Sequence, residues 1–150
     1  MIWFRRLLAL PVVLVSYAIV LFVHLAWGQH LWWERGILIT RLAERSWPMR
    51  TWFRRWGGFT PGHAMMLSHT ADVRVIEHEM VHVEQHEANA IAGLVLGLAF
   101  VWASPFTLLA WLLMPLFCYL AAMLVAVLHG KNAYRGNHLE TAAYDATDLS

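Results

Sequence analysis

The chain has 150 residues, of which 59% are apolar and only 14% are charged, and its formal net charge is +1. This composition excludes an ordinary soluble globular protein, although the length suits a single compact domain, 1–150. The one cysteine, Cys118, excludes a disulfide within the chain and a metal site built from cysteines.

Two long apolar tracts, 7–27 and 91–128, contain no Lys, Arg, Asp or Glu. Each is long enough to cross a bilayer at about 20 residues per crossing. The first is too long for the apolar region of a signal peptide and lacks a small-x-small cleavage pattern, so we interpret it as a retained membrane helix. The sequence therefore predicts a mainly α integral membrane protein with about three transmembrane helices.

The segment 28–58 is rich in tryptophan and arginine. Such mixing occurs in proteins that bind single-stranded nucleic acid. Beside a membrane helix, however, indole rings and guanidinium groups suit the lipid headgroup region, so we expect a bilayer partner and no nucleic acid. Within this segment the pattern predicts an amphipathic helix over 32–46, ended by Pro48.

A turn and a short strand are predicted for 59–69, because a cluster of Gly and Pro precedes a brief apolar run. The residues 64–68 are interpreted either as a strand that pairs with a substrate backbone or as a plain connecting strand. His63 and His69 have no partner at ligand spacing and are expected to be ordinary surface histidines.

The motif that dominates the sequence is His78-Glu79-Met80-Val81-His82 within a predicted helix over 71–90. Residues four apart lie on the same helical face, so His78 and His82 can direct two imidazoles at one ion. Glu79 lies close enough to reach a water bound to that ion. The alternative is a solvated, charged helix that is merely rich in histidine.

The second apolar tract predicts a membrane hairpin with arms 91–103 and 106–128, because Ser104-Pro105 interrupts the pattern and 38 residues are too many for one crossing. Small residues at Gly93, Gly97 and Ala99 form a surface that a second helix can approach closely.

A catalytic zinc needs a third protein ligand. The hairpin returns the chain to the side of the membrane that it left, so Glu140, on a predicted helix 137–148, is the preferred candidate. His86 is a second candidate, but three imidazoles along one straight helix are spread over too great a length to converge easily. A third histidine six residues after His82 is excluded, because Ala88 occupies that position.

His78-Glu79-x-x-His82 followed by Asn137-x-x-Glu140-x-x-Ala143 resembles the gluzincin metallopeptidases, whose membrane members include the CAAX prenyl endopeptidases and the heat-shock-induced bacterial membrane proteases. The resemblance implies a zincin-like site at the membrane surface. In it, His78, His82 and Glu140 would be Zn²⁺ ligands and Glu79 the catalytic base. Those families place an Asp where this chain has Tyr144.

On this interpretation the chain is a zinc metallopeptidase that cleaves a peptide or membrane-protein substrate near the bilayer surface. An oxyanion donor or a residue that orients the ligands is expected among Tyr144, Tyr134, His138, His86 and Asn137. The expected location is a bacterial inner membrane. The active site would face the cytoplasm, because residues 28–75 carry seven Arg and three acidic residues.

Two other hypotheses come from different classes of protein. His24 and His129 lie near the ends of predicted membrane helices and are candidate haem ligands in a membrane haem- or metal-binding protein without hydrolytic activity. An inactive zincin-like assembly factor is the third interpretation, although a purely structural metal site does not need Glu79. The sequence gives no indication of oligomeric state.

Overall fold

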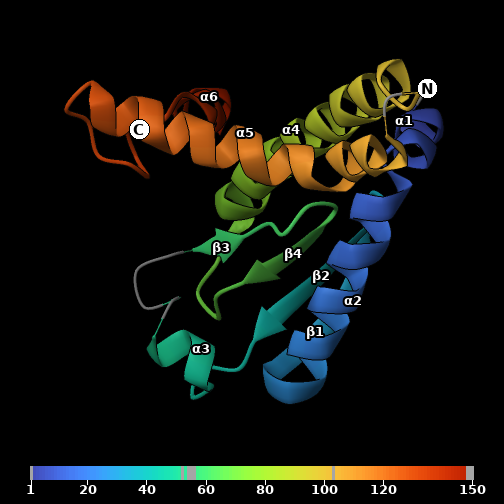
Figure 1. Cartoon of the computed structure of the whole chain (residues 1–150). Coiled ribbons are helices and arrows are strands. Elements are labelled where there is room, and N and C mark those ends of the chain that lie inside the picture. Colours follow the sequence, from blue (N-terminus) through green and yellow to red (C-terminus); the bar gives the residue numbers. More distant parts are fainter. Residues whose placement is uncertain (1, 52, 54–56, 103, 148–150) are drawn as a thin grey trace.

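The computed structural model describes residues 2–51, 53, 57–102 and 104–147. The chain is mainly helical and includes a small sheet (Figure 1). The helices are α1 (Ile2–Leu8), α2 (Leu10–Trp27), α3 (Trp47–Arg50), α4 (Val73–Ala99), the 3-10 helix η1 (Pro105–Leu108), α5 (Leu109–Leu128) and α6 (His138–Thr147). The strands are β1 (Gly28–Glu34), β2 (Ile37–Leu42), β3 (Gly58–Phe59) and β4 (Ala64–Leu67).

Two helices in the described ranges are long and apolar enough to cross a membrane: α2, and the segment Phe106–Leu128 that contains α5. One face of α2 is buried, and the other exposes large apolar side chains such as Phe22 and Leu25. The first turns of α2 pack against the first turns of α5, through Val12, Val13, Trp111 and Leu112, and the two helices run in different directions from there (Figure 1). The predicted third span, 91–103, does not form a separate helix, because its residues as far as Ala99 continue α4.

The predicted amphipathic helix over 32–46 is wrong, because this segment forms most of the β1–β2 hairpin. Arg35 and Gly36 both have positive φ, of 50° and 75°, which is the backbone of a two-residue hairpin turn. The strand Ile37–Leu42 is rich in β-branched residues and is buried on both faces, so its side chains do not show the half-polar pattern of a surface helix. Four further residues expected at the membrane interface lie outside the described residues: Trp52, Arg54, Arg55 and Trp56.

The sheet has the strand order β1-β2-β4-β3 and forms a layer between α2 and α4. β2 and β4 are parallel, and the two outer pairs are antiparallel. Alternate residues of β2 point to opposite faces: Leu38 packs with Val20 of α2, whereas Ile39 packs with Val83 of α4. The sheet therefore fixes the position of α4 relative to the first apolar helix.

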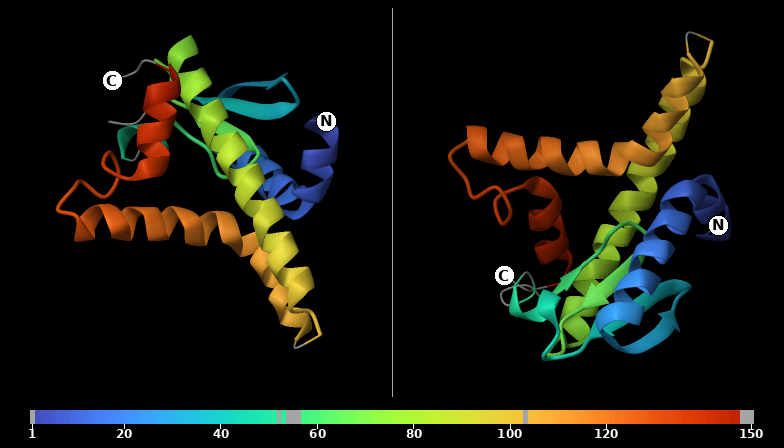
Figure 2. Two further views of the ribbon diagram at one scale, coloured as in Figure 1. Left: turned by 90° about the horizontal axis from the view of Figure 1, so that it is seen from above. Right: turned by 60° about the horizontal axis from the view of Figure 1, so that its bottom comes forward.

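The chain reverses direction between α4 and α5, and α6 then lies beside the first half of α4 (Figure 2). Glycine allows the close approach of α4 and α5, as predicted. A Cβ at Gly93 would lie 2.3 Å from the carbonyl oxygen of Ala110, and one at Gly97 would lie 2.9 Å from that of Thr107. This reversal and α6 bring two distant parts of the sequence to one place.

Candidate metal centre

The amino-terminal half of α4 supplies three of the four residues singled out for chemistry. Asp72 caps this helix by accepting a hydrogen bond from the amide of Val75. His78, Glu79 and His82 are all buried, at 5%, 4% and 7% exposure. Burial of three titratable side chains on one helix is costly unless they have polar partners or bind a cation.

Glu140 reaches the same place from α6, and Asn137 determines how that helix starts. The side-chain oxygen of Asn137 accepts hydrogen bonds of 3.0 Å from the amides of Leu139 and Glu140, as an N-cap residue does. Its amide nitrogen donates to the carbonyl of Tyr134, 2.8 Å away. Asn137 is 1% exposed. It therefore fixes the first turn of α6, which carries Glu140.

The three side chains form a triangle. Nε2 of His78 lies 3.2 Å from Nε2 of His82. Glu140 places Oε2 at 3.4 Å from the first of these nitrogens and Oε1 at 3.4 Å from the second. Ligands bonded to zinc at about 2.0–2.2 Å in a tetrahedron are separated by about 3.4 Å. The buried His78, His82 and Glu140 group could therefore hold a metal ion.

The charges in this cluster are coupled. Burial disfavours the ionised form of Glu140, but hydrogen bonds from His78 and His82 outweigh burial and lower the pKa of Glu140 to about 2. Burial also disfavours the imidazolium of His82, but the carboxylate of Glu140 overcomes that effect and raises the pKa of His82. Glu140 is thus a carboxylate that attracts positive charge, whether as protons or as a metal cation.

Glu79 lies beside the triangle rather than in it. Its Oε2 accepts a 2.6 Å hydrogen bond from the hydroxyl of Thr60. Gly58 leaves the room that this side chain needs, because a Cβ there would lie 2.7 Å from Cγ of Glu79. Burial raises the pKa of Glu79 despite the hydrogen bond from Thr60. A buried carboxylate with a raised pKa is suited to exchanging protons.

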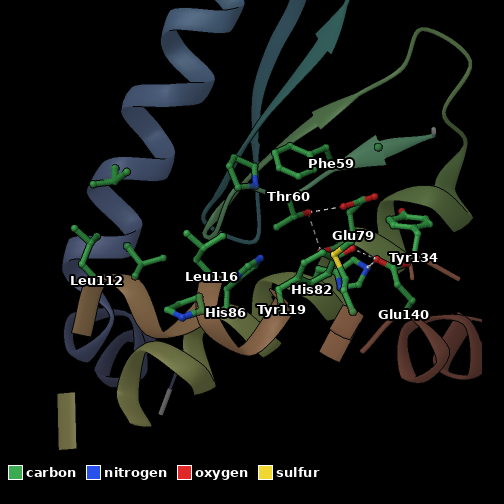
Figure 3. Close-up of a pocket in the computed structure, with 16 residues that line it drawn as sticks. Phe59, Thr60, Glu79, His82, His86, Leu112, Leu116, Tyr119, Tyr134 and Glu140 are labelled. Atoms are coloured by element: carbon green, nitrogen blue, oxygen red, sulfur yellow. Dashed lines mark hydrogen bonds and ion pairs between the residues drawn. The ribbon is translucent and has the colours of Figure 1, made fainter. Parts of the chain in front are cut away.

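A mainly apolar cavity of about 440 Å³ opens beside these groups. Figure 3 shows Glu79 and Glu140 toward one end, and His86, Leu112 and Leu116 toward the other. The lining comes from α2, the β3 segment, α4, α5 and α6 together with the loop that precedes α6: Val12, Val15, Gly58, Phe59, Thr60, Pro61, Glu79, His82, His86, Leu112, Pro115, Leu116, Tyr119, Met123, Tyr134 and Glu140. The metal group therefore borders a space that can receive an apolar chemical group.

The remaining predicted site residues differ in position. The ring of Tyr144 packs against His78 with centroids 4.6 Å apart, and burial raises the pKa of Tyr144. Tyr134 lines the cavity, and burial raises its pKa as well. His86 also lines the cavity but lies outside the metal group, and burial lowers its pKa to about 4. His138 is exposed and lines a different cavity, with His129.

The two candidate haem ligands, His24 and His129, lie in different parts of the structure. His24 lies 3.0 Å from the hydroxyl of Thr40, and Nδ1 of His129 lies 2.8 Å from the carbonyl of Val125. The carboxyl-terminal ends of α2 and α5, which bear these histidines, lie at different sides of the molecule (Figure 1). This arrangement does not bring the pair to a common iron.

One expectation about the segment before α4 is wrong, and one of two alternatives is favoured. His63 is not a surface residue: it is 1% exposed, and its Nδ1 lies 2.9 Å from Oε1 of Glu87. Of the two interpretations of 64–68, the plain connecting strand is the simpler, because Ala64–Leu67 pairs with β2 along its length and Met66 and Leu67 also pair with β3. The strand at this edge of the sheet is β3.

Three residues with roles at the site were not identified from the sequence. Thr60 binds Glu79, Tyr119 donates a 2.9 Å hydrogen bond to Oε1 of Glu140, and Gln85 contacts Nδ1 of His82 at 2.9 Å. Thr60 and Tyr119 lie in a turn cluster and an apolar tract, where no spacing rule connects them to the motif. Gln85 could have been found, because it lies one helical turn from His82.

Comparison of the chain with models of known protein families, with curated proteins and with solved structures finds no match. Function must therefore be inferred from the residues that meet at the site. Those residues are two imidazoles, one carboxylate ligand and one adjacent carboxylate beside an apolar cavity.

Proposed function

We propose that the protein is a zinc-dependent membrane metallopeptidase that hydrolyses peptide bonds near the bilayer surface. The observation that supports this most strongly is the position of Glu79. Its side chain is buried next to the His78, His82 and Glu140 triangle, accepts a hydrogen bond from Thr60, and lines the cavity. A site that only binds a metal for structural reasons has no use for such a carboxylate.

The donor set favours zinc over magnesium and calcium. Two imidazole nitrogens and one carboxylate oxygen, separated by 3.2–3.4 Å, suit a tetrahedral ion with one open position. Magnesium and calcium prefer six or more oxygen ligands. Zinc bound by these residues supplies Lewis acidity and lowers the pKa of a coordinated water toward neutrality.

In the proposed reaction, Glu79 accepts a proton from the attacking water and passes it to the leaving amine. Thr60 orients the carboxylate through the bond to Oε2. Tyr134 is the proposed oxyanion donor, because its ring lines the cavity beside Glu140 (Figure 3). Tyr144 packs on the ring of His78 and would hold that ligand in place.

The cavity suggests the kind of substrate. Its apolar end is lined by Val12 and Val15 of α2 and by Leu112 and Leu116 of α5, both of which belong to helices long and apolar enough to cross a membrane. The strand β3 lies at the edge of the sheet and lines the same cavity. We therefore propose an extended, apolar peptide segment of a membrane protein, bound alongside β3.

The proposed location is a bacterial inner membrane, with the site on the cytoplasmic side. Residues 28–75, which follow the first apolar tract, carry seven Arg and three acidic residues, and arginine in such a segment favours the cytoplasm. A reporter fused after Ser150 should be active in the cytoplasm. Periplasmic activity of that reporter would contradict the orientation.

The test of the proposed activity is Glu79→Gln in the full chain, purified in detergent and given an apolar reporter peptide. Zinc content should stay at the wild-type level, because Glu79 is not a ligand. Hydrolysis should fall by about 10²–10⁴-fold, the usual contribution of a general base. Glu84→Gln, an exposed residue on the same helix, is the matched control. Wild-type hydrolysis by Glu79→Gln would overturn the proposal.

A further inference from the structure

We propose that Gln85 is a positioning residue that fixes the tautomer and orientation of His82 and links the two helices that supply the metal ligands. This inference rests on the proposed zinc site. Gln85 lies on α4, one turn beyond His82, and its side-chain amide makes two contacts. Oε1 lies 2.9 Å from Nδ1 of His82, and Nε2 donates a 3.0 Å hydrogen bond to the carbonyl of Leu139.

The hydrogen bond to Leu139 determines which atom of the Gln85 amide faces His82. The backbone carbonyl of Leu139 can only accept a hydrogen bond, so the amide nitrogen of Gln85 must face it. The amide oxygen of Gln85 therefore faces His82, and this oxygen can also only accept. Consequently Nδ1 of His82 carries a hydrogen. A neutral imidazole has one N–H, so the lone pair remains on Nε2, the atom that points into the triangle.

The two imidazoles are held in different ways. Nδ1 of His78 is buried and has no hydrogen-bond partner among the described residues. Its ring instead packs against Tyr144. His82 therefore depends on a directional hydrogen bond where His78 depends on ring packing. Loss of the Gln85 amide should affect the orientation of His82 without a direct effect on His78.

The same amide also connects ligands that are distant in the sequence. Leu139 directly precedes Glu140 and belongs to the first turn of α6. Gln85 thus joins the imidazole on α4 to the backbone beside the carboxylate on α6. Hydrogen-bond partners of this kind orient metal-binding histidines, and their removal usually costs 10–100-fold in metal affinity.

The experiment measures zinc affinity of the full chain in detergent by competition with a chromophoric zinc chelator. Gln85→Leu has nearly the same size and loses both contacts, so its affinity should fall about 10–100-fold. Gln85→Glu keeps an acceptor for Nδ1–H of His82 but loses the donor to Leu139, so its affinity should fall by less than that of Gln85→Leu. Gln29→Leu, at an exposed position of β1, is the matched control. Gln85→Asn, too short to reach either partner, replaces Gln85→Leu if the latter does not fold.

The outcomes separate this inference from the proposed function. Wild-type affinity in Gln85→Leu or Gln85→Asn would overturn the role of Gln85 while leaving the zinc site intact. An equal loss in Gln85→Glu and Gln85→Leu would also overturn it, because the acceptor for His82 would then be irrelevant. Absence of zinc binding by the wild type would remove the metal site and the inference together.

Discussion

The hydroxyl of Thr60 donates a 2.6 Å hydrogen bond to Oε2 of Glu79, so the segment between β3 and β4 holds the proposed base on the metal helix. Glu79 is 4% exposed, and burial raises its pKa. The bond from Thr60 acts in the opposite direction, because it stabilises the carboxylate. The bond from Thr60 is therefore one of the contacts that oppose the effect of burial on the pKa of Glu79.

Thr60→Val should remove that contact and change the pKa of Glu79 in a measurable direction. Loss of the hydroxyl raises the pKa of Glu79 further, and a general base works only when it is deprotonated. The acidic limb of the pH profile of kcat/KM should move to higher pH, and activity at neutral pH should fall on the order of tenfold. Thr51→Val, at an exposed threonine, should leave the profile unchanged. An acidic limb that moves to lower pH would contradict this assignment.

A cluster of charged and titratable side chains joins α1 and the loop before β4 to α4, and Glu87 is at its centre. The carboxylate lies 2.9 Å from Nδ1 of His63 and 3.7 Å from Nε of both Arg5 and Arg6. Glu87→Ala would leave His63 and Arg6 buried without this carboxylate. The free energy of unfolding should fall by about 3–5 kcal/mol, the usual cost of breaking a buried pair.

Denaturant unfolding in detergent micelles measures this effect. Glu84→Ala removes an exposed carboxylate from the same helix and should change stability by less than about 0.5 kcal/mol. If the Glu87 and Glu84 variants proved equally stable, the cluster would contribute nothing to the docking of α1 on α4.

The α4–α5 crossing should be sensitive to a single side chain. A Cβ at Gly93 would meet the backbone of Ala110, which cannot rotate away, so Gly93→Val must push the two helices apart. Because α5 leads to α6 and Glu140, the variant should bind zinc less tightly as well as unfold more easily. Ala92→Val, at the neighbouring exposed position, should behave as wild type in both assays. Unchanged zinc affinity in Gly93→Val would show that the site does not depend on this crossing.

The sequence predicted the metal group because helical periodicity and one interruption of an apolar tract were enough to place its three residues. His78 and His82 are four residues apart on a helix, which settles their relative position without any knowledge of the fold. Glu140 required one further step, the interruption at Ser104-Pro105, which indicated that the chain doubles back. These three residues do meet in the structure.

The sheet was missed for physical reasons. Strand β2 is buried between two helices, so Ile37 and Leu38 face opposite apolar layers and no alternation of polar and apolar residues marks the strand. The abundant Trp and Arg around it suggested a membrane interface instead. His63 was misjudged because its partner, Glu87, comes after the motif in the sequence, and contacts between distant residues leave no spacing pattern in a sequence.

The central claim is that two imidazoles from α4 and one carboxylate from α6 bind a single zinc ion. Metal analysis of the purified full chain tests it most directly, with the wild type compared to His78→Ala, Glu140→Ala and the control Glu84→Ala. We predict one zinc per chain in the wild type and the control, and a loss of at least about tenfold in affinity in each ligand variant. Stoichiometric zinc held by Glu140→Ala at wild-type affinity would contradict the account.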